Sequence, residues 1–261
     1  MLPTDLNRIV SLEPSVTAIL FALGQQARLA AVSEWCDRLV DVGDRPRLPS
    51  TWSAKPEDIV ALSPDLVIAS VPYRAEAITD LLQAKLNVLC LRPQHLADTY
   101  AHIAWLGRLT DAVEEAEQVI SQMQADFEAI RRQVAGLHRP RVYVEMWPKP
   151  PMSSPDWVGE LVEIAGGEFV PAKPGRAVTD DEIREADPEI IAVAWAGVTD
   201  PPLQRVIQRS GWDQVSAVLE GRVMAVDEIY LNAPGSNLVH GARLLADAIH
   251  PEVFSELAVG D

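Results

Sequence analysis

The chain has 261 residues, 48% of them apolar, which is enough for one large or two medium-sized domains with hydrophobic cores. Its 38 acidic and 22 basic residues give a net charge of −16, which opposes non-specific binding to nucleic acid and to anionic membrane surfaces. No apolar stretch of the sequence approaches the roughly 20 residues of a membrane span. These totals indicate a globular protein and exclude nucleic acid as an expected partner.

The N-terminus and the cysteines bear on the compartment. Residues 1–8 lack the charged and apolar regions of a signal peptide, so we expect either a mature form or a protein that stays in the cytoplasm. Cys36 and Cys90 are expected to be free thiols, because a chain of this length does not need a disulfide to fold.

The first half of the chain alternates predicted strands and helices. One helix is expected at 14–23, ended by Gly24, and a short one at 56–62, where Pro56 takes a tolerated first-turn position. Alternation of this kind predicts βαβ units and a mostly parallel sheet. The predicted strands are residues 8–12, 29–33, 66–70 and 88–91.

The centre of the chain predicts one long helix over residues 111–134, about 36 Å long. Asp111 with Glu114 resembles a capping box, and Gly136 with Pro140 supplies the stop. We interpret this helix as a rigid strut between two lobes; a coiled-coil partner face is the alternative. Its apolar face comprises Ala112, Ala116, Val119, Ile120, Met123, Phe127, Ile130 and Val134.

The second half restarts the pattern. Helices are expected at 157–165, closed by Gly166 and Gly167, and at 237–249. We interpret the glycine pair as a helix stop and not as a phosphate-binding loop. The predicted strands of this half are residues 142–146, 190–194 and 223–226.

An internal repeat relates the two halves. Residues 57–69 (EDIVALSPDLVIA) match residues 181–193 (DEIREADPEIIAV), and two shorter pairs flank them in the same order. Three matched segments in one order predict two similar α/β lobes with a ligand cleft between them. The predicted boundaries are an N-terminal lobe at 1–107, a linking helix at 108–138 and a C-terminal lobe at 139–261.

Large aromatic residues follow the predicted strands. Ligands of open α/β sheets bind beyond the carboxyl ends of the strands, and aromatic rings there suit a large, flat or partly apolar ligand. Lobe packing is the alternative role for some of them. The candidate ligand-binding residues are Trp35, Trp52, Tyr73, Trp147, Trp195 and Tyr230.

Signatures of enzymes and metal sites are missing from the sequence. It contains no G-x-S-x-G elbow, no phosphate-binding Walker loop and no H-E-x-x-H motif, and its five histidines show no ligand spacing. We therefore predict no catalytic residues, no catalytic cofactor and no metal site. One alternative stays open for a metal, which is convergence of Glu34, Cys36, His95 and Glu145 near strand ends.

Glu57 and Asp181 hold equivalent places in the repeat, each in the first turn of a short helix. Such acids can simply complement the helix dipole. One acid per lobe also gives a two-point negative surface that suits a two-fold positive partner.

Three segments, RIVSLEPSVTAILFALG, STWSAKPEDIVALSPDLVIAS and AGGEF, together resemble the substrate-binding proteins of cobalamin and iron-siderophore ABC importers. The resemblance runs from about Arg8 to Ile249. It implies two Rossmann-like lobes joined by a single long helix, with limited hinge motion. It also implies a bound corrinoid such as cobalamin, a haem or a ferric siderophore, a dimeric membrane permease as partner and a periplasmic location.

The resemblance assigns roles to individual residues. Trp52 matches a corrin-facing tryptophan of the family, and Trp35 falls where the family carries an aromatic. Glu57 and Asp181 match the acids that dock on permease arginines. The resemblance implies departures from the family's cobalamin binders, which carry tryptophans where this chain has Gly175 and near Glu228. The chain also lacks their second-lobe disulfide, and these differences leave room for ligands other than cobalamin.

The sequence thus predicts a monomeric, non-enzymatic solute-binding protein that delivers a bulky ligand to a permease. Two alternatives belong to other classes: a cytoplasmic corrinoid-binding or sensing protein without a permease, and an enzyme acting in the cleft.

Overall fold

A computed structural model describes residues 6–172 and 174–254. The chain divides into two compact units. The N-terminal unit comprises Met1–Met123 with Ala233–Asn237, and the C-terminal unit comprises Gln124–Asn232 with Leu238–Asp261. The long helix α5 (Val113–Gln133) runs through the boundary between them.

The N-terminal unit is built on a five-stranded sheet in the order β3-β2-β1-β4-β5, in which every neighbouring pair is parallel. Val10 of β1 lies opposite Ala31 and Val67 of its two neighbours, and all three side chains are buried. Apolar strands of this kind are typical of parallel sheets covered on both faces. The strands are β1 (Ile9–Ser11), β2 (Leu29–Ser33), β3 (Arg47–Leu48), β4 (Leu66–Ala69) and β5 (Val88–Cys90).

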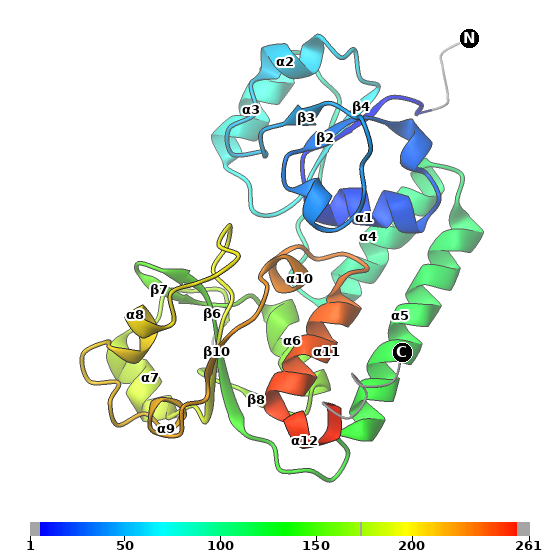
Figure 1. The fold of residues 1–261 in the computed structure, drawn as a ribbon. Coiled ribbons are helices and arrows are strands. Elements are labelled where there is room, and N and C mark those ends of the chain that lie inside the picture. The colour runs from blue at the N-terminus through cyan, green and yellow to red at the C-terminus, as the bar shows by residue number, and fades with distance from the viewer. Residues whose placement is uncertain (1–5, 173, 255–261) are drawn as a thin grey trace. The chain divides into compact units, whose positions relative to one another are not determined.

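Helices α2 and α3 lie on one side of this sheet and α1 and α4 on the other (Figure 1). Ile59 and Leu81 anchor α2 and α3 in the core around Val10. Proline occupies the first helical position of α1 and of α2, as predicted. The helical segments are α1 (Pro14–Ala22), η1 (Gln26–Arg28), η2 (Cys36–Arg38), α2 (Pro56–Val60), α3 (Ala75–Gln83) and α4 (Leu96–Leu109).

Helix α5 confirms the long central helix but begins later than predicted. Asp111 has a φ of +58° and lies in the turn that follows α4, so the predicted capping box of Asp111 and Glu114 is wrong. The predicted apolar face is otherwise correct, since Ala116, Met123 and Phe127 are buried. None of the helices in the described part of the chain combines the length and hydrophobicity that a membrane span requires.

The C-terminal unit is built on the sheet order β10-β9-β6-β7. Strand β9 pairs in parallel with β6. Two further strands also pair with β6: Val142 lies opposite Phe169 of the parallel β8, and Glu145 lies opposite Ser153 of the antiparallel β7. The strands are β6 (Arg141–Pro148), β7 (Pro151–Ser153), β8 (Glu168–Phe169), β9 (Ile190–Val193) and β10 (Val223–Ala225).

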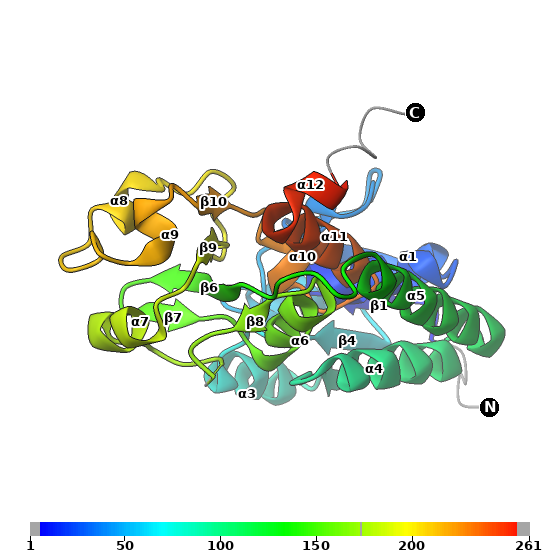
Figure 2. The same ribbon diagram turned by 90° about the horizontal axis from the view of Figure 1, so that it is seen from below.

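Helices α7, α8 and α9 cover one face of this sheet, and α6 and α11 pack together on the other (Figure 2). Trp212 and Tyr143 form the centre of the core under α7, with their rings edge to face. Gly166 has a φ of +85° directly after α6, which confirms its predicted role as a helix stop. The helices are α6 (Asp156–Ile164), α7 (Asp180–Ala186), α8 (Gln204–Ile207), α9 (Ser216–Leu219), α10 (Ile229–Asn232), α11 (Leu238–Ile249) and α12 (Pro251–Phe254).

The internal repeat is confirmed by the topology. The order β1-β4-β5 of the N-terminal unit returns as β6-β9-β10 in the C-terminal unit, with parallel pairing throughout. Helix α2 leads into β4, and α7 leads into β9 at the same place in the pattern. The fold is therefore the predicted α/β class, with two lobes and a long connecting helix.

Candidate functional site

Three candidate aromatics lie at one edge of the N-terminal sheet. Trp35, Trp52 and Tyr73 follow β2, β3 and β4 respectively, and these parallel strands place their carboxyl ends at the same edge. Trp35 is 36% exposed and Trp52 47% exposed, while Tyr73 is half-buried. Tryptophan is normally well buried, so two exposed indoles at this edge are available to a flat ligand.

Trp52 is held in one orientation by its neighbours. Its indole Nε1 donates a hydrogen bond to the carbonyl oxygen of Pro72 at 2.9 Å, and Nη2 of Arg74 donates to the carbonyl oxygen of Trp52 at 2.6 Å. Both partners belong to the loop between β4 and α3, which also carries Tyr73. The structure thus brings the loops of Trp52 and Tyr73 together.

A buried carboxyl group that the sequence analysis did not single out lies at the same edge. Glu13 follows β1, is only 6% exposed, and accepts a hydrogen bond from the hydroxyl of Thr51 at 2.8 Å. Burial raises the pKa of Glu13 to about 8, although the hydrogen bonds from Thr51 act in the opposite direction. The available signal was an acidic residue directly after an apolar strand and directly before a helix-starting proline.

Cys36 has a structural place beside Trp35. Its thiol is fully buried and shares hydrogen bonds with the hydroxyls of Thr17 at 3.1 Å and Ser33 at 3.3 Å. Burial raises the pKa of Cys36. Cys36 and the half-buried Cys90 are both free, which confirms the prediction of two thiols.

The C-terminal sheet carries the other three aromatics, in different environments. Trp147, near the end of β6, is 43% exposed. Tyr230, in α10 beyond β10, is half-buried and its ring lies 4.2 Å from that of His240. Trp195, directly beyond β9, is 3% exposed and belongs to the core cluster of this unit. In this structure Trp195 therefore has the alternative role considered for these aromatics, which is packing within the lobe.

Trp195 belongs to a buried polar cluster centred on Glu145 of β6. The fully buried Glu145 carboxylate accepts two hydrogen bonds from the Arg209 guanidinium, at 2.5 and 2.7 Å, and one from Nε1 of Trp195 at 2.8 Å. The hydroxyl of Tyr143 donates a fourth at 3.1 Å. Two of the four donors come from a cation, so the buried charge is compensated.

The structure gives no support to the metal alternative of Glu34, Cys36, His95 and Glu145. No group of three or more His, Cys, Asp or Glu side chains among the described residues could hold a metal ion. The physical reason is that Glu145 is committed to Arg209 and Cys36 to two hydroxyls.

Glu57 and Asp181 are equivalent in the structure as in the repeat. Each is the second residue of its helix, α2 or α7, and each is exposed. Asp181 forms an ion pair with Arg184 one turn further along α7. Both side chains are exposed, so this pair contributes little free energy.

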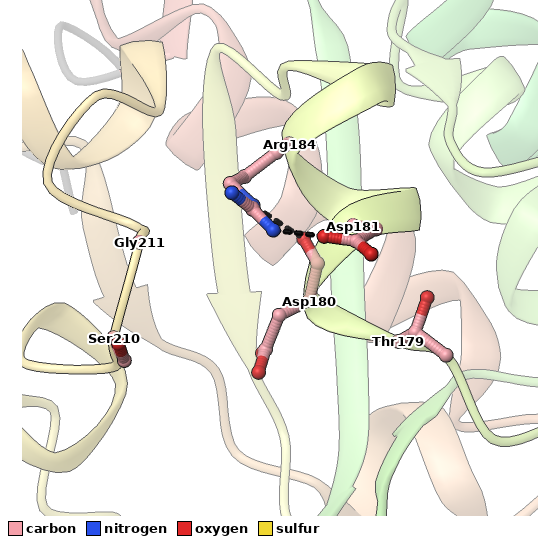
Figure 3. A pocket seen from close by; sticks show the side chains of 6 residues that line it. All are labelled: Thr179, Asp180, Asp181, Arg184, Ser210 and Gly211. Carbon is pink, nitrogen blue, oxygen red and sulfur yellow. Dashed lines mark hydrogen bonds and ion pairs between the residues drawn. The ribbon is translucent and has the colours of Figure 1, made fainter.

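A surface pocket of about 390 Å³ lies beside Asp181 (Figure 3). The first turn of α7 forms one wall, and Ser210 with Gly211 forms the other. Asp180 in this wall accepts a hydrogen bond from Nε1 of Trp212 at 2.8 Å, which ties the pocket to the core of the unit.

The cap of α7 does not use Asp181. Thr179 accepts a hydrogen bond from the backbone N–H of Glu182, and Glu182 accepts one from the backbone N–H of Thr179. The Arg176 guanidinium is the main reason why the pKa of Glu182 falls to about 2. The simple capping role proposed for acids here therefore belongs to Glu182.

Gly175 and Glu228, where the resemblance led us to expect departures from the cobalamin binders, have distinct local environments. Gly175 has a φ of +70°, which a tryptophan would adopt only with strain. Glu228 is 5% exposed, and its carboxylate accepts a hydrogen bond from Nδ2 of Asn232 at 3.3 Å.

Known proteins resemble this chain along most of its length. A family model described as periplasmic binding protein matches residues 9–230. An uncharacterized ABC transporter substrate-binding lipoprotein of Bacillus subtilis is 27% identical, over 96% of this chain and 82% of the relative. A cobalamin-binding protein of Halobacterium salinarum is 26% identical, over 95% of this chain and 71% of the relative.

Solved structures share the fold. A periplasmic heme-binding protein of Pseudomonas aeruginosa superposes with a TM-score of 0.82 at 19% identity, covering 95% of this chain and 94% of that one. The family match spans most of the chain, both sheets and the long helix between them. The chain therefore belongs to the periplasmic binding protein family, whose members are extracytoplasmic solute-binding proteins of ABC importers.

Proposed function

We propose that this protein captures a bulky metal chelate, a corrinoid such as cobalamin first and a haem or ferric siderophore otherwise, and delivers it as a monomer to a dimeric ABC permease. The observation that carries the proposal is the pair of exposed indoles at the sheet edge of the N-terminal unit, of which Trp52 is held in one orientation, together with the exposed Trp147 at the sheet edge of the other unit. Exposed rings with fixed orientation lose little entropy when a flat ligand stacks on them.

The ligand class is tested by titrating the purified protein with cyanocobalamin, cobinamide, haemin and a ferric hydroxamate. Tryptophan quenching and isothermal calorimetry report binding independently. We expect one-to-one binding of one of these chelates. Dissociation constants above 1 mM for all four would contradict the proposal.

The role of Trp52 is tested against a matched indole. Trp52→Ala should weaken binding by about 1–3 kcal/mol, as expected for loss of a stacked anchor. Trp105 on α4 is similarly exposed, at 48%, but lies outside the sheet edge, so Trp105→Ala should leave the affinity unchanged. Equal effects of the two substitutions would remove Trp52 from the site.

The proposed delivery step uses Glu57 and Asp181. Permease arginines would pair with one acid on each unit, which would fix orientation, and the energies should be modest and sensitive to salt. The double variant Glu57→Ala with Asp181→Ala should retain ligand affinity and lose uptake in cells carrying the cognate permease.

The control for charge removes two exposed acids elsewhere, Glu76 on α3 and Glu185 on α7. The control variant has the same net charge as the docking variant and should support normal uptake. Normal uptake by the docking variant would favour the alternative of a corrinoid-binding or sensing protein without a permease. Extracytoplasmic residence is proposed with the transport role and is tested by fractionating cells that express the native gene.

A further inference from the structure

Glu13 and Thr51 connect the first strand of the N-terminal unit to its candidate ligand loop. Thr51 is 1% exposed, and its hydroxyl donates to Oε1 of Glu13 at 2.8 Å. A hydrogen bond between the carboxyl and the backbone of Thr51 adds a second link. The residue after Thr51 is Trp52, so a buried carboxyl group anchors the chain directly next to the exposed indole.

Glu13 and Trp52, on either side of Thr51, make contacts with different parts of the N-terminal unit. On the Glu13 side the contacts are buried, between β1 and α1, which are regular elements of the core. On the Trp52 side the contacts are to the loop between β4 and α3, through Pro72 and Arg74. Residues 49–55, which include the Thr51 that contacts Glu13, form no helix or strand. Of the chain around Glu13, this loop, here called the cover, can therefore move at the lowest cost in free energy.

The surroundings of Glu13 offer no compensating charge. The described parts of β1, of α1 and of the segment 233–237, where Gly235 lies against Ser15 of α1, contain no other titratable side chain. From η2 the facing titratable group is the thiol of Cys36, whose pKa Glu13 itself raises slightly. From the β4–α3 loop the charged group is Arg74, which donates to the carbonyl of Trp52.

We propose that Glu13 is a positioning residue of the ligand site: its neutral form holds Thr51 and Trp52 in the ligand-accepting position, and its ionisation releases them. A carboxylate buried with one hydroxyl and one backbone donor is poorly solvated, and the structure can hydrate it by displacing the cover. The proposal rests on the proposed function, because it takes Trp52 to be a ligand contact.

The pH range follows from burial. The pKa of Glu13 is raised to about 8, so the neutral form predominates at pH 6.5 and is roughly one part in thirty at pH 9.5. If only the neutral form accepts ligand, the apparent affinity falls by about thirty-fold between these two values.

The first test observes Trp52 without any ligand. Protein labelled with ¹⁵N-tryptophan is titrated from pH 6 to 10, and the Trp52 indole N–H signal, assigned with Trp52→Phe, is followed by NMR. It should titrate with a midpoint near 8 in the wild type and in Cys36→Ser. It should be flat in Glu13→Gln, which keeps the acceptor but cannot ionise. The Trp105 signal should be flat in all three proteins.

A flat Trp52 signal in the wild type, or an equal titration in Glu13→Gln, overturns the proposal. The second test measures cyanocobalamin and haemin affinity at pH 6.5 and 9.5. The affinity of the wild type should fall about thirty-fold between pH 6.5 and 9.5, and the affinity of Glu13→Gln should not change with pH. An affinity of the wild type that is independent of pH overturns the positioning role even if the indole titrates. Failure of every chelate to bind at either pH contradicts the proposed function, and the indole titration still decides whether Glu13 controls Trp52.

Discussion

The buried ion pair of Glu145 and Arg209 allows a stability prediction with a worked magnitude. Arg209→Met removes the cation but keeps most of the side-chain volume. Among the described residues, Trp195 and Tyr143 are then the side-chain donors left to the fully buried Glu145 carboxylate. Breaking a buried pair from one side typically costs about 3–5 kcal/mol. Because two neutral donors remain, we expect a loss near the lower value, about 3 kcal/mol, in the free energy of unfolding of the C-terminal unit.

The assay is urea unfolding followed by tryptophan fluorescence, since Trp195 and Trp212 report on this core. The matched control is Arg184→Met, which breaks the exposed pair with Asp181 and should cost less than about 1 kcal/mol. Adding Glu145→Gln to Arg209→Met removes the unpaired charge and should restore part of the loss. Equal stabilities for the Arg209 and Arg184 variants would refute the reasoning that burial makes this pair costly to break.

Three further predictions concern glycine and carboxyl positions. Gly166→Ala should destabilise by about 2 kcal/mol or more, because a Cβ at this positive φ would meet Val134 at 2.9 Å, whereas Gly24→Ala, with open space and a similar φ, should cost about 1 kcal/mol in chemical denaturation. The folded state keeps the Glu13 proton that the unfolded state releases above pH 4.5. The free energy of unfolding of the wild type should therefore fall relative to that of Glu13→Gln as pH rises to about 8, by up to about 1.4 kcal/mol per pH unit, and a difference that is constant with pH would contradict a buried neutral acid. The opposite sign holds for Glu182, whose lowered pKa gives stability above pH 4.5 that is lost as pH falls toward about 2, so Glu182→Gln should be less stable than wild type at pH 6 and equal to it at pH 2.

The sequence predicted the elements whose local signals agree with the final structure. Apolar runs bounded by turn residues predicted β1, β2, β4, β5, β6, β9 and β10 but missed the short strands β3, β7 and β8. Pro14, Pro56 and Gly166 marked helix ends that the structure confirms. The start of α5 was wrong because Asp111 has the composition of a cap but the backbone of a left-handed turn, which the packing of α4 against α5 imposes. At this turn Gly107 packs against Ala112 and Ala116 so closely that no Cβ would fit.

The candidate site was only partly readable from the sequence, because exposure depends on tertiary packing. Trp147 and Trp195 both lie at the end of a strand, yet one is 43% exposed and the other is buried on Glu145. Trp195 packs into a core cluster with residues that are distant in the sequence, among them Val206 and Trp212, whereas Trp147 is not part of that cluster. Glu13 was missed for the same reason, since its partner Thr51 lies beyond β2 and β3.

Helices α2 and α7 differ in how their first turns are capped, which bears on the roles of Glu57 and Asp181. Helix α7 has a complete capping box in Thr179 and Glu182, while the first turn of α2 follows Lys55 and has no side-chain cap within the described residues. In α2 the two acids of the first turn, Glu57 and Asp58, complement the helix dipole without a side-chain cap, so Glu57→Ala should lower the stability of its unit slightly. In α7 that complement is redundant, so Asp181→Ala should leave stability unchanged. A loss of uptake caused by Asp181→Ala alone would then come from a lost contact with the partner and not from a weakened helix, which makes Asp181 the more decisive of the two positions.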